Sequence, residues 1–135
     1  MNIINEKLPW SEVCQAYSEG KLGIGADRHY AITAKGLGLI SSRTSKFLIY
    51  LSYITFITSI VCSFIFAWWC FILGFFCFGY LINSATSADA KALRKAVLSN
   101  NKLYDYAFDH NWITVYDISG YMNSEEHINL RHNKL

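Results

Sequence analysis

The chain has 135 residues, of which 53% are hydrophobic and 16% charged, and its formal net charge is +2. A nearly balanced charge without a dense basic stripe or zinc-finger spacing argues against nucleic acid as a partner. The length is also too short for two independent globular domains beside a membrane-embedded segment.

Residues 1–46 are predicted to form an N-terminal cytosolic region. Pro9 suits a first helical turn, so we expect a short helix over residues 10–17 that ends before Gly20. Residues 20–25 are rich in glycine but lack the Lys-Ser/Thr pair of a phosphate-binding loop, which favours a flexible turn. Residues 30–33 and 37–40 flank Gly36 and are predicted to form a small β-hairpin.

The next 42 residues, 47–88, contain no Asp, Glu, Lys, Arg or His, and residues 47–82 are almost wholly apolar. As one helix, residues 47–82 would measure about 54 Å, whereas a bilayer core is about 30 Å thick. We therefore expect two spans, residues 47–66 and 68–86, within a transmembrane hairpin over residues 47–86. One long tilted span is the alternative, because no Gly, Pro, Asn or Asp marks the turn.

Both ends of the apolar run are flanked by basic residues, which tend to remain on the cytoplasmic side. This pattern predicts a multi-pass protein of the cell membrane with two spans and both termini in the cytoplasm. Tryptophan favours the headgroup boundary, so Trp68 and Trp69 are expected to mark the turn. The membrane-interface anchors predicted from these patterns are Trp68, Trp69, Arg43, Lys46, Lys91, Arg94 and Lys95.

Small and hydroxyl-bearing residues recur at helical spacing within both spans. Such residues allow helices to approach closely, and their hydroxyls are able to bond across the contact. We expect these faces to pack within the hairpin and to serve as an interface between copies in a homo-oligomer; a hydroxyl-lined pore is the most specific version. The predicted interface residues are Ser52, Thr55, Ser59, Ser63, Cys70, Gly74 and Cys77.

Residues 87–135 are predicted to form a C-terminal cytosolic region. The second span is expected to continue as a helix to Leu98 and to break at residues 99–101. A short helix over 102–109, a strand over 112–118 and a loose tail from Gly120 should follow. The strand is expected to pair with residues 30–40. The predicted fold class is thus a mainly α membrane protein with a two-span helical hairpin and a small α+β cytosolic domain formed by both tails.

No residue pattern indicates a catalytic, cofactor or metal site. His127 and His132 are expected to be solvated, and the four cysteines lack a CxxC pair and fit a reducing cytoplasm. We therefore expect a non-enzymatic, oligomeric membrane protein that presents its cytosolic domain to a cytosolic or membrane protein partner. The alternative is a membrane-permeabilising or channel-forming effector gated by a cytosolic ligand or partner; a lipid-modifying enzyme ranks third.

Overall fold

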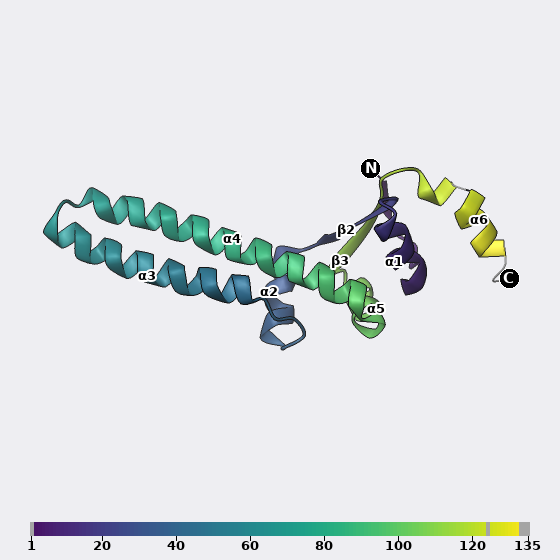
Figure 1. Ribbon diagram of the computed structural model, residues 1–135, viewed down its shortest axis with the longest axis horizontal. Coiled ribbons are helices and arrows are strands. Elements are labelled where there is room, and N and C mark those ends of the chain that lie inside the picture. Colours follow the sequence, from purple (N-terminus) through teal and green to yellow (C-terminus); the bar gives the residue numbers. More distant parts are fainter. Residues whose placement is uncertain (1, 124, 133–135) are drawn as a thin grey trace. The chain divides into compact units, whose positions relative to one another are not determined.

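The computed structural model describes residues 2–123 and 125–132, most of them in helices (Figure 1). The chain divides into two compact units. The sheet unit comprises Met1–Asp27 and Arg94–Leu135, and the hairpin unit comprises Arg28–Leu93. The long helix α4 belongs to both units, because it extends from Trp69 to Ser99.

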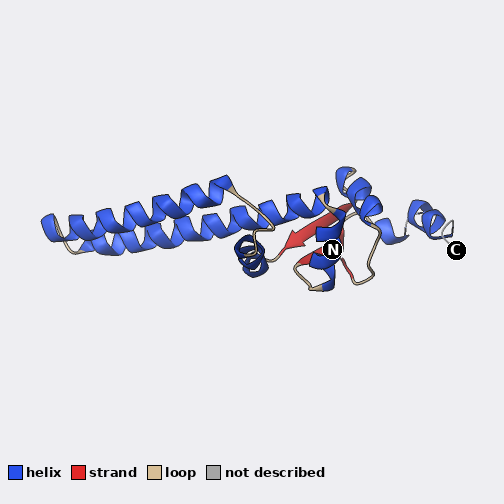
Figure 2. Ribbon diagram, turned by 90° about the horizontal axis from the view of Figure 1, so that it is seen from below, coloured by secondary structure: helices blue, strands red, loops and turns tan. Residues whose placement is uncertain are grey.

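The sheet unit contains three antiparallel strands in the order β1-β3-β2, shown in red in Figure 2. The outer strands β1 (Asn2–Ile4) and β2 (Leu22–Ala26) come from the N-terminal part of the chain, and the central strand β3 (Ile113–Asp117) comes from the C-terminal part. The register places Val115 opposite both Ile4 and Ile24. The prediction that both tails contribute to one small α+β fold is therefore confirmed.

One face of this sheet forms the core of the unit. Ile113 and Val115 are buried while Thr114 between them is exposed, as strand periodicity requires. The helices α1 (Trp10–Ser18) and α5 (Asn101–Asp109) contact each other, and each also contacts the sheet. The indole nitrogen of Trp10 donates to the carbonyl oxygen of Val97, 3.1 Å away, which ties α1 to the last turns of α4.

The hairpin unit consists of α2 (Arg28–Gly36), α3 (Arg43–Ile65) and residues 69–93 of α4. Helices α3 and α4 run side by side in opposite directions in Figure 1 and Figure 2. Ser42 caps α3 by accepting a hydrogen bond from the amide of Ser45 at 3.1 Å. Both helices are long and apolar enough to cross a membrane.

Most of the predicted helices and the third strand are confirmed. The helices expected over residues 10–17, 68–98 and 102–109 correspond to α1, α4 and α5, and the strand expected over 112–118 corresponds to β3. The apolar run breaks between Ile65 and Trp69, so one continuous helix through it is excluded.

The predicted β-hairpin over residues 30–40 is wrong. Residues 30–36 lie in α2, whose Ala31 and Ala34 are buried one helical turn apart. Gly36, which was expected in the β-turn, is instead the last residue of the helix. Gly38 follows with a φ of 73°, and the amide of Leu39 donates to the carbonyl of Ala34. The strand that pairs with β3 from this part of the chain is β2, within the segment that was expected to be a flexible turn.

The predicted loose tail is also wrong for the described residues after Gly120. A 3₁₀ turn, η1, covers Tyr121–Asn123, and a helix, α6, covers Glu125–His132. Residues 124 and 133–135 lie outside the described residues, so that part of the tail prediction is not addressed.

Candidate functional site

Helices α3 and α4 approach each other closely at Ser59 and Gly74. A Cβ atom placed on Gly74 would lie 2.0 Å from the Cβ and 2.1 Å from the Oγ of Ser59. Contacts this short do not occur between real atoms, so the observed separation of the helices requires glycine at position 74. The structure thus brings together two residues that the sequence placed on separate stripes.

The buried residues of α3 are three serines at intervals of seven. Ser45, Ser52 and Ser59 are buried, and this spacing keeps them on one face of the helix. At Ser59 the small side chain lets the backbone of α4 approach closely, as in membrane helix pairs.

The hydroxyls of the predicted stripe bond within their own helix. Ser52 donates to the carbonyl of Ile49 at 2.7 Å, Ser59 to that of Phe56 at 2.9 Å, and Ser63 to that of Ile60 at 2.7 Å. The bonds across the contact that the sequence suggested are not seen among these three residues. Close packing, rather than interhelical hydrogen bonding, therefore characterises this contact.

The other predicted interface residues lie at the edge of the contact or outside it. Thr55 and Cys70 line a shallow groove on the hairpin, next to Ser59 and together with Thr58 and Cys62. Ser63 is half-buried, whereas Cys77 is exposed. The helical position next to Cys77 is more enclosed: Phe78 is half-buried, and its ring centroid lies 5.3 Å from that of Phe56.

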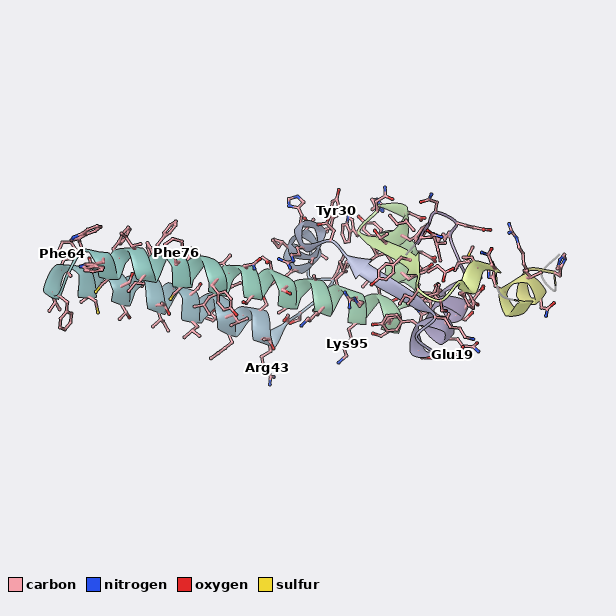
Figure 3. All side chains as sticks on the ribbon, turned by 90° about the horizontal axis from the view of Figure 1, so that it is seen from above. Glu19, Tyr30, Arg43, Phe64, Phe76 and Lys95 are labelled. Carbon is pink, nitrogen blue, oxygen red and sulfur yellow. The ribbon has the colours of Figure 1, made fainter. Side chains whose placement is uncertain are left out.

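The outer surface of the hairpin is the reverse of a soluble protein's surface. Between residues 43 and 84, all of which are described, the buried residues are Ser45, Ser52, Ser59 and Gly74, and every large apolar side chain is at least partly exposed. Phe64 is 87% exposed and Phe76 71%, and both project outward in Figure 3. In each helix only 11% of the most apolar window is buried. The core helix of a soluble protein would have most of this window buried.

The predicted anchors lie mainly on exposed positions. Trp68 and Trp69 are 72% and 66% exposed at the connection between α3 and α4. Arg43 extends away from the first turn of α3 in Figure 3. Lys46, Lys91 and Lys95 are also exposed, while Arg94 is half-buried with a buried Nε.

A buried charged cluster joins α2 to both helices of the hairpin. The Lys35 ammonium donates to the Ser45 hydroxyl at 2.8 Å and to Asp89 Oδ2 at 3.3 Å. Asp89 is only 2% exposed, and its Oδ1 has no hydrogen-bond partner among the described residues. Sequence reasoning missed this cluster, although Asp89 is the only acidic residue between Arg28 and Leu93.

A second polar cluster lies inside the sheet unit. Glu12 Oε1 lies 2.7 Å from His127 Nδ1 and accepts a hydrogen bond from the Tyr121 hydroxyl at 2.9 Å. His127 is 6% exposed, so the prediction that it is solvated is wrong; His132 is exposed. The contact with Glu12 on α1 holds α6 in place. Among the described residues, no group of three or more His, Cys, Asp and Glu side chains is arranged to hold a metal ion.

Tyr104 and Asp117 are among the titratable groups of the sheet unit whose pKa is shifted. Burial raises the pKa of Tyr104 to about 12, and the Tyr104 hydroxyl donates to the carbonyl of Leu8 at 2.8 Å. Burial also acts to raise the pKa of Asp117, but backbone amides that donate to its carboxylate outweigh this and lower it. Those amides include Ser119, Tyr121 and Met122, so Asp117 shapes the turn between β3 and η1.

No family model matches this chain, and no curated protein or solved structure shows significant similarity to it.

Proposed function

We propose that this chain is an integral membrane interaction protein. Helices α3 and α4 cross the bilayer as an antiparallel hairpin, both chain ends lie in the cytosol, and the sheet unit binds a protein partner. Copies of the hairpin associate into a homo-oligomer.

The observation that carries the proposal is the reversed burial pattern of the hairpin. Exposing a large apolar side chain to water instead of burying it costs about 1.5–3 kcal/mol, and the hairpin exposes such residues along both helices. A bilayer removes this cost. Inside a bilayer, apolar side chains have no hydrophobic driving force to associate with one another, which explains why the helices pack through serine and glycine.

The length of the helices agrees with a crossing. At 1.5 Å per residue, the 23 residues of α3 extend about 34 Å, close to the thickness of a bilayer's hydrocarbon core. Arg43 and Lys46 lie in its first turn, whereas its far end is apolar and is followed by Trp68 and Trp69. This asymmetry supports a cytosolic location for the open end of the hairpin.

Self-association is supported by the groove beside the helix contact. Thr58 is exposed there, and its hydroxyl donates to the carbonyl of Ile54 at 2.8 Å, so this hydroxyl needs no partner on a neighbouring helix. Small side chains on an outward surface permit the close approach of a second hairpin.

Topology is tested with single cysteines in a full-length variant in which the four native cysteines are replaced by serine. Trp68→Cys marks the hairpin connection, Ser18→Cys the N-terminal part and Lys102→Cys the C-terminal part. An impermeant thiol reagent should label only the Trp68→Cys chain in intact cells and all three after permeabilisation. Labelling of Ser18→Cys and Lys102→Cys from opposite sides would refute the hairpin topology.

Particle mass in nanodiscs tests assembly, and dye release from liposomes tests the channel alternative. We expect a mass of more than one copy and no dye release. A monomeric mass would refute the homo-oligomer, and dye release by purified protein would favour the permeabilising effector.

A further inference from the structure

We propose that residues 28–40, comprising α2 and the turn after it, lie in the headgroup region of the bilayer, and that the exposed basic residues of the same unit, Arg43, Lys46 and Lys91, bind anionic phospholipid there. We call residues 28–40 the α2 segment. This inference rests on the proposed insertion of the hairpin and adds a lipid-binding surface to it.

The α2 segment is fixed across the open end of the hairpin. Arg28 Nη1 donates to Asn83 Oδ1 at 2.7 Å, and Lys35 bonds Ser45 of α3 and Asp89 of α4 as described above. Figure 1 shows α2 from the side and Figure 2 shows it down its own axis, while the hairpin stays lengthwise in both views. Helix α2 therefore runs crosswise to the hairpin. With the hairpin upright in a bilayer, α2 lies parallel to the membrane surface.

The α2 segment exposes apolar side chains that water does not favour. Ile32 is 48% exposed, Leu37 61% and Leu39 45%, and Tyr30 at 36% supplies a ring with a polar tip. The buried face of the helix is made of Ala31 and Ala34. Large side chains are therefore exposed and small ones buried, as in α3. Helices with exposed apolar and basic groups at such a position bind in the plane of the interface.

Charge identifies the kind of lipid. The hairpin unit contains five Lys or Arg residues against Asp89, a formal charge of +4, whereas the sheet unit has a formal charge of −2. Lys35 is engaged by Asp89. Arg43, Lys46 and Lys91 are exposed, and within the described residues no side-chain hydrogen bond or ion pair occupies them. The basic charge of this unit thus complements an anionic bilayer surface, which attracts each nearby Lys or Arg by about 1 kcal/mol.

The first experiment measures membrane depth in the full-length chain with its four native cysteines replaced by serine. An environment-sensitive fluorophore is attached to Leu37→Cys or Leu39→Cys in the α2 segment, or to Ile57→Cys in α3, where the native side chain is 61% exposed. The protein is placed in phosphatidylcholine nanodiscs with or without phosphatidylglycerol. Quenching is compared for lipid nitroxides near the headgroup, for lipid nitroxides deep in the acyl chain, and for aqueous iodide.

The expected result is strong headgroup-level quenching at Leu37→Cys and Leu39→Cys, and deep quenching at Ile57→Cys. Deep quenching at Ile57→Cys together with iodide access at both α2 positions would overturn the lipid-binding surface and leave the proposed function intact. Protection of the α2 positions from iodide without lipid quenching would overturn it in favour of a protein or a second copy covering α2. Absence of lipid quenching at Ile57→Cys would overturn the proposed function itself.

The second experiment measures lipid preference by native mass spectrometry. Replacing Arg43 and Lys46 with Gln together should reduce the preference for phosphatidylglycerol over phosphatidylcholine by roughly 5-fold per charge removed. The matched control is the charge-preserving pair Arg43→Lys and Lys46→Arg, which should keep the preference. Equal preference in the neutral and charge-preserving pairs would overturn the role of anionic lipid.

Discussion

Adding one methyl group at Gly74 tests the helix contact most directly. The new Cβ would lie 2.0 Å from the Ser59 Cβ, whereas ordinary contacts begin at about 3.4–4 Å. The helices must therefore separate by roughly 1.5–2 Å at this point, and overpacking of this kind costs about 1–3 kcal/mol. We expect Gly74→Ala to destabilise the hairpin by that amount in reversible unfolding with mixed micelles, followed by helical circular dichroism.

The partner substitution and a matched control make this prediction specific. Ser59→Gly removes the two side-chain atoms that clash and leaves the Ser59 Cα 3.6 Å from the new Cβ, an ordinary contact. The double variant Ser59→Gly with Gly74→Ala should therefore show a favourable coupling energy of about 1 kcal/mol or more. Gly79→Ala in the same helix has nothing within 4 Å of its new Cβ, so it should be neutral or stabilising through helix propensity.

The reasoning would be refuted if Gly74→Ala and Gly79→Ala had the same effect on stability. Additive effects of Ser59→Gly and Gly74→Ala on stability would also refute it, because a coupling energy of zero would show that the two residues are not in contact.

Three further predictions concern the sheet unit. Because the pKa of Asp117 is lowered in the folded state, its contribution to stability is present above the unfolded pKa and is lost as the pH falls. Asp117→Asn should therefore cost about 1 kcal/mol of stability at neutral pH and make stability depend less on pH in the acid range. The substitution should also speed amide hydrogen exchange in the turn after β3. The raised pKa of Tyr104 gives a contribution to stability that is present below the ordinary value of 10.0 and lost as the pH rises toward about 12. Tyr104→Phe should therefore remove an ionisation near pH 12 from an ultraviolet titration and cost about 1–2 kcal/mol of stability at neutral pH. A Cβ on Gly23 would lie 2.2 Å from the Tyr116 ring but one on Gly25 3.7 Å from it, so Gly23→Ala should lower the thermal midpoint more than Gly25→Ala does; equal midpoints would contradict this packing.

The sequence predicts the long helices well because their signals are strong and local. The apolar run has no Asp, Glu, Lys, Arg or His, its length exceeds one bilayer thickness, and basic residues flank both of its ends, so the sequence favours two helices over one long span. The turn between them was expected from Trp68 and Trp69, despite the absence of a turn-forming residue. The contact of Ser59 with Gly74 follows in part from their small size, but their register depends on how the two helices meet.

The errors lie where short segments depend on tertiary partners. Tyr30 and Ile32 have strand propensity, but Ala31 and Ala34 lie on the same buried face only because the segment is helical. Conversely, Gly23 and Gly25 suggested a loop, although Leu22 and Ile24 alternate with them as buried strand residues. The glycines suit this strand because the Tyr116 ring of β3 lies over Gly23. The alternation of Leu22 and Ile24 with glycine has the two-residue period of a strand, but the glycines favoured a loop in the sequence analysis.

The cluster of Lys35, Ser45 and Asp89 was not accessible to sequence reasoning for a different reason. Its members come from three helices, with 54 positions between Lys35 and Asp89. No local sequence pattern predicts a tertiary contact among residues this far apart in the chain. The absence of any other acidic residue in the hairpin unit was the available indication that Asp89 has a specific role.

The order of strands in the sheet has a consequence for biosynthesis. The central strand β3 is translated last, so β1 and β2 leave the ribosome without the strand that both require. The sheet is therefore completed after translation of the hairpin, and the nascent N-terminal segment must wait in an unpaired state. A stop codon placed before Ile113 should leave the apolar helices competent for insertion while depriving both earlier strands of their pairing partner.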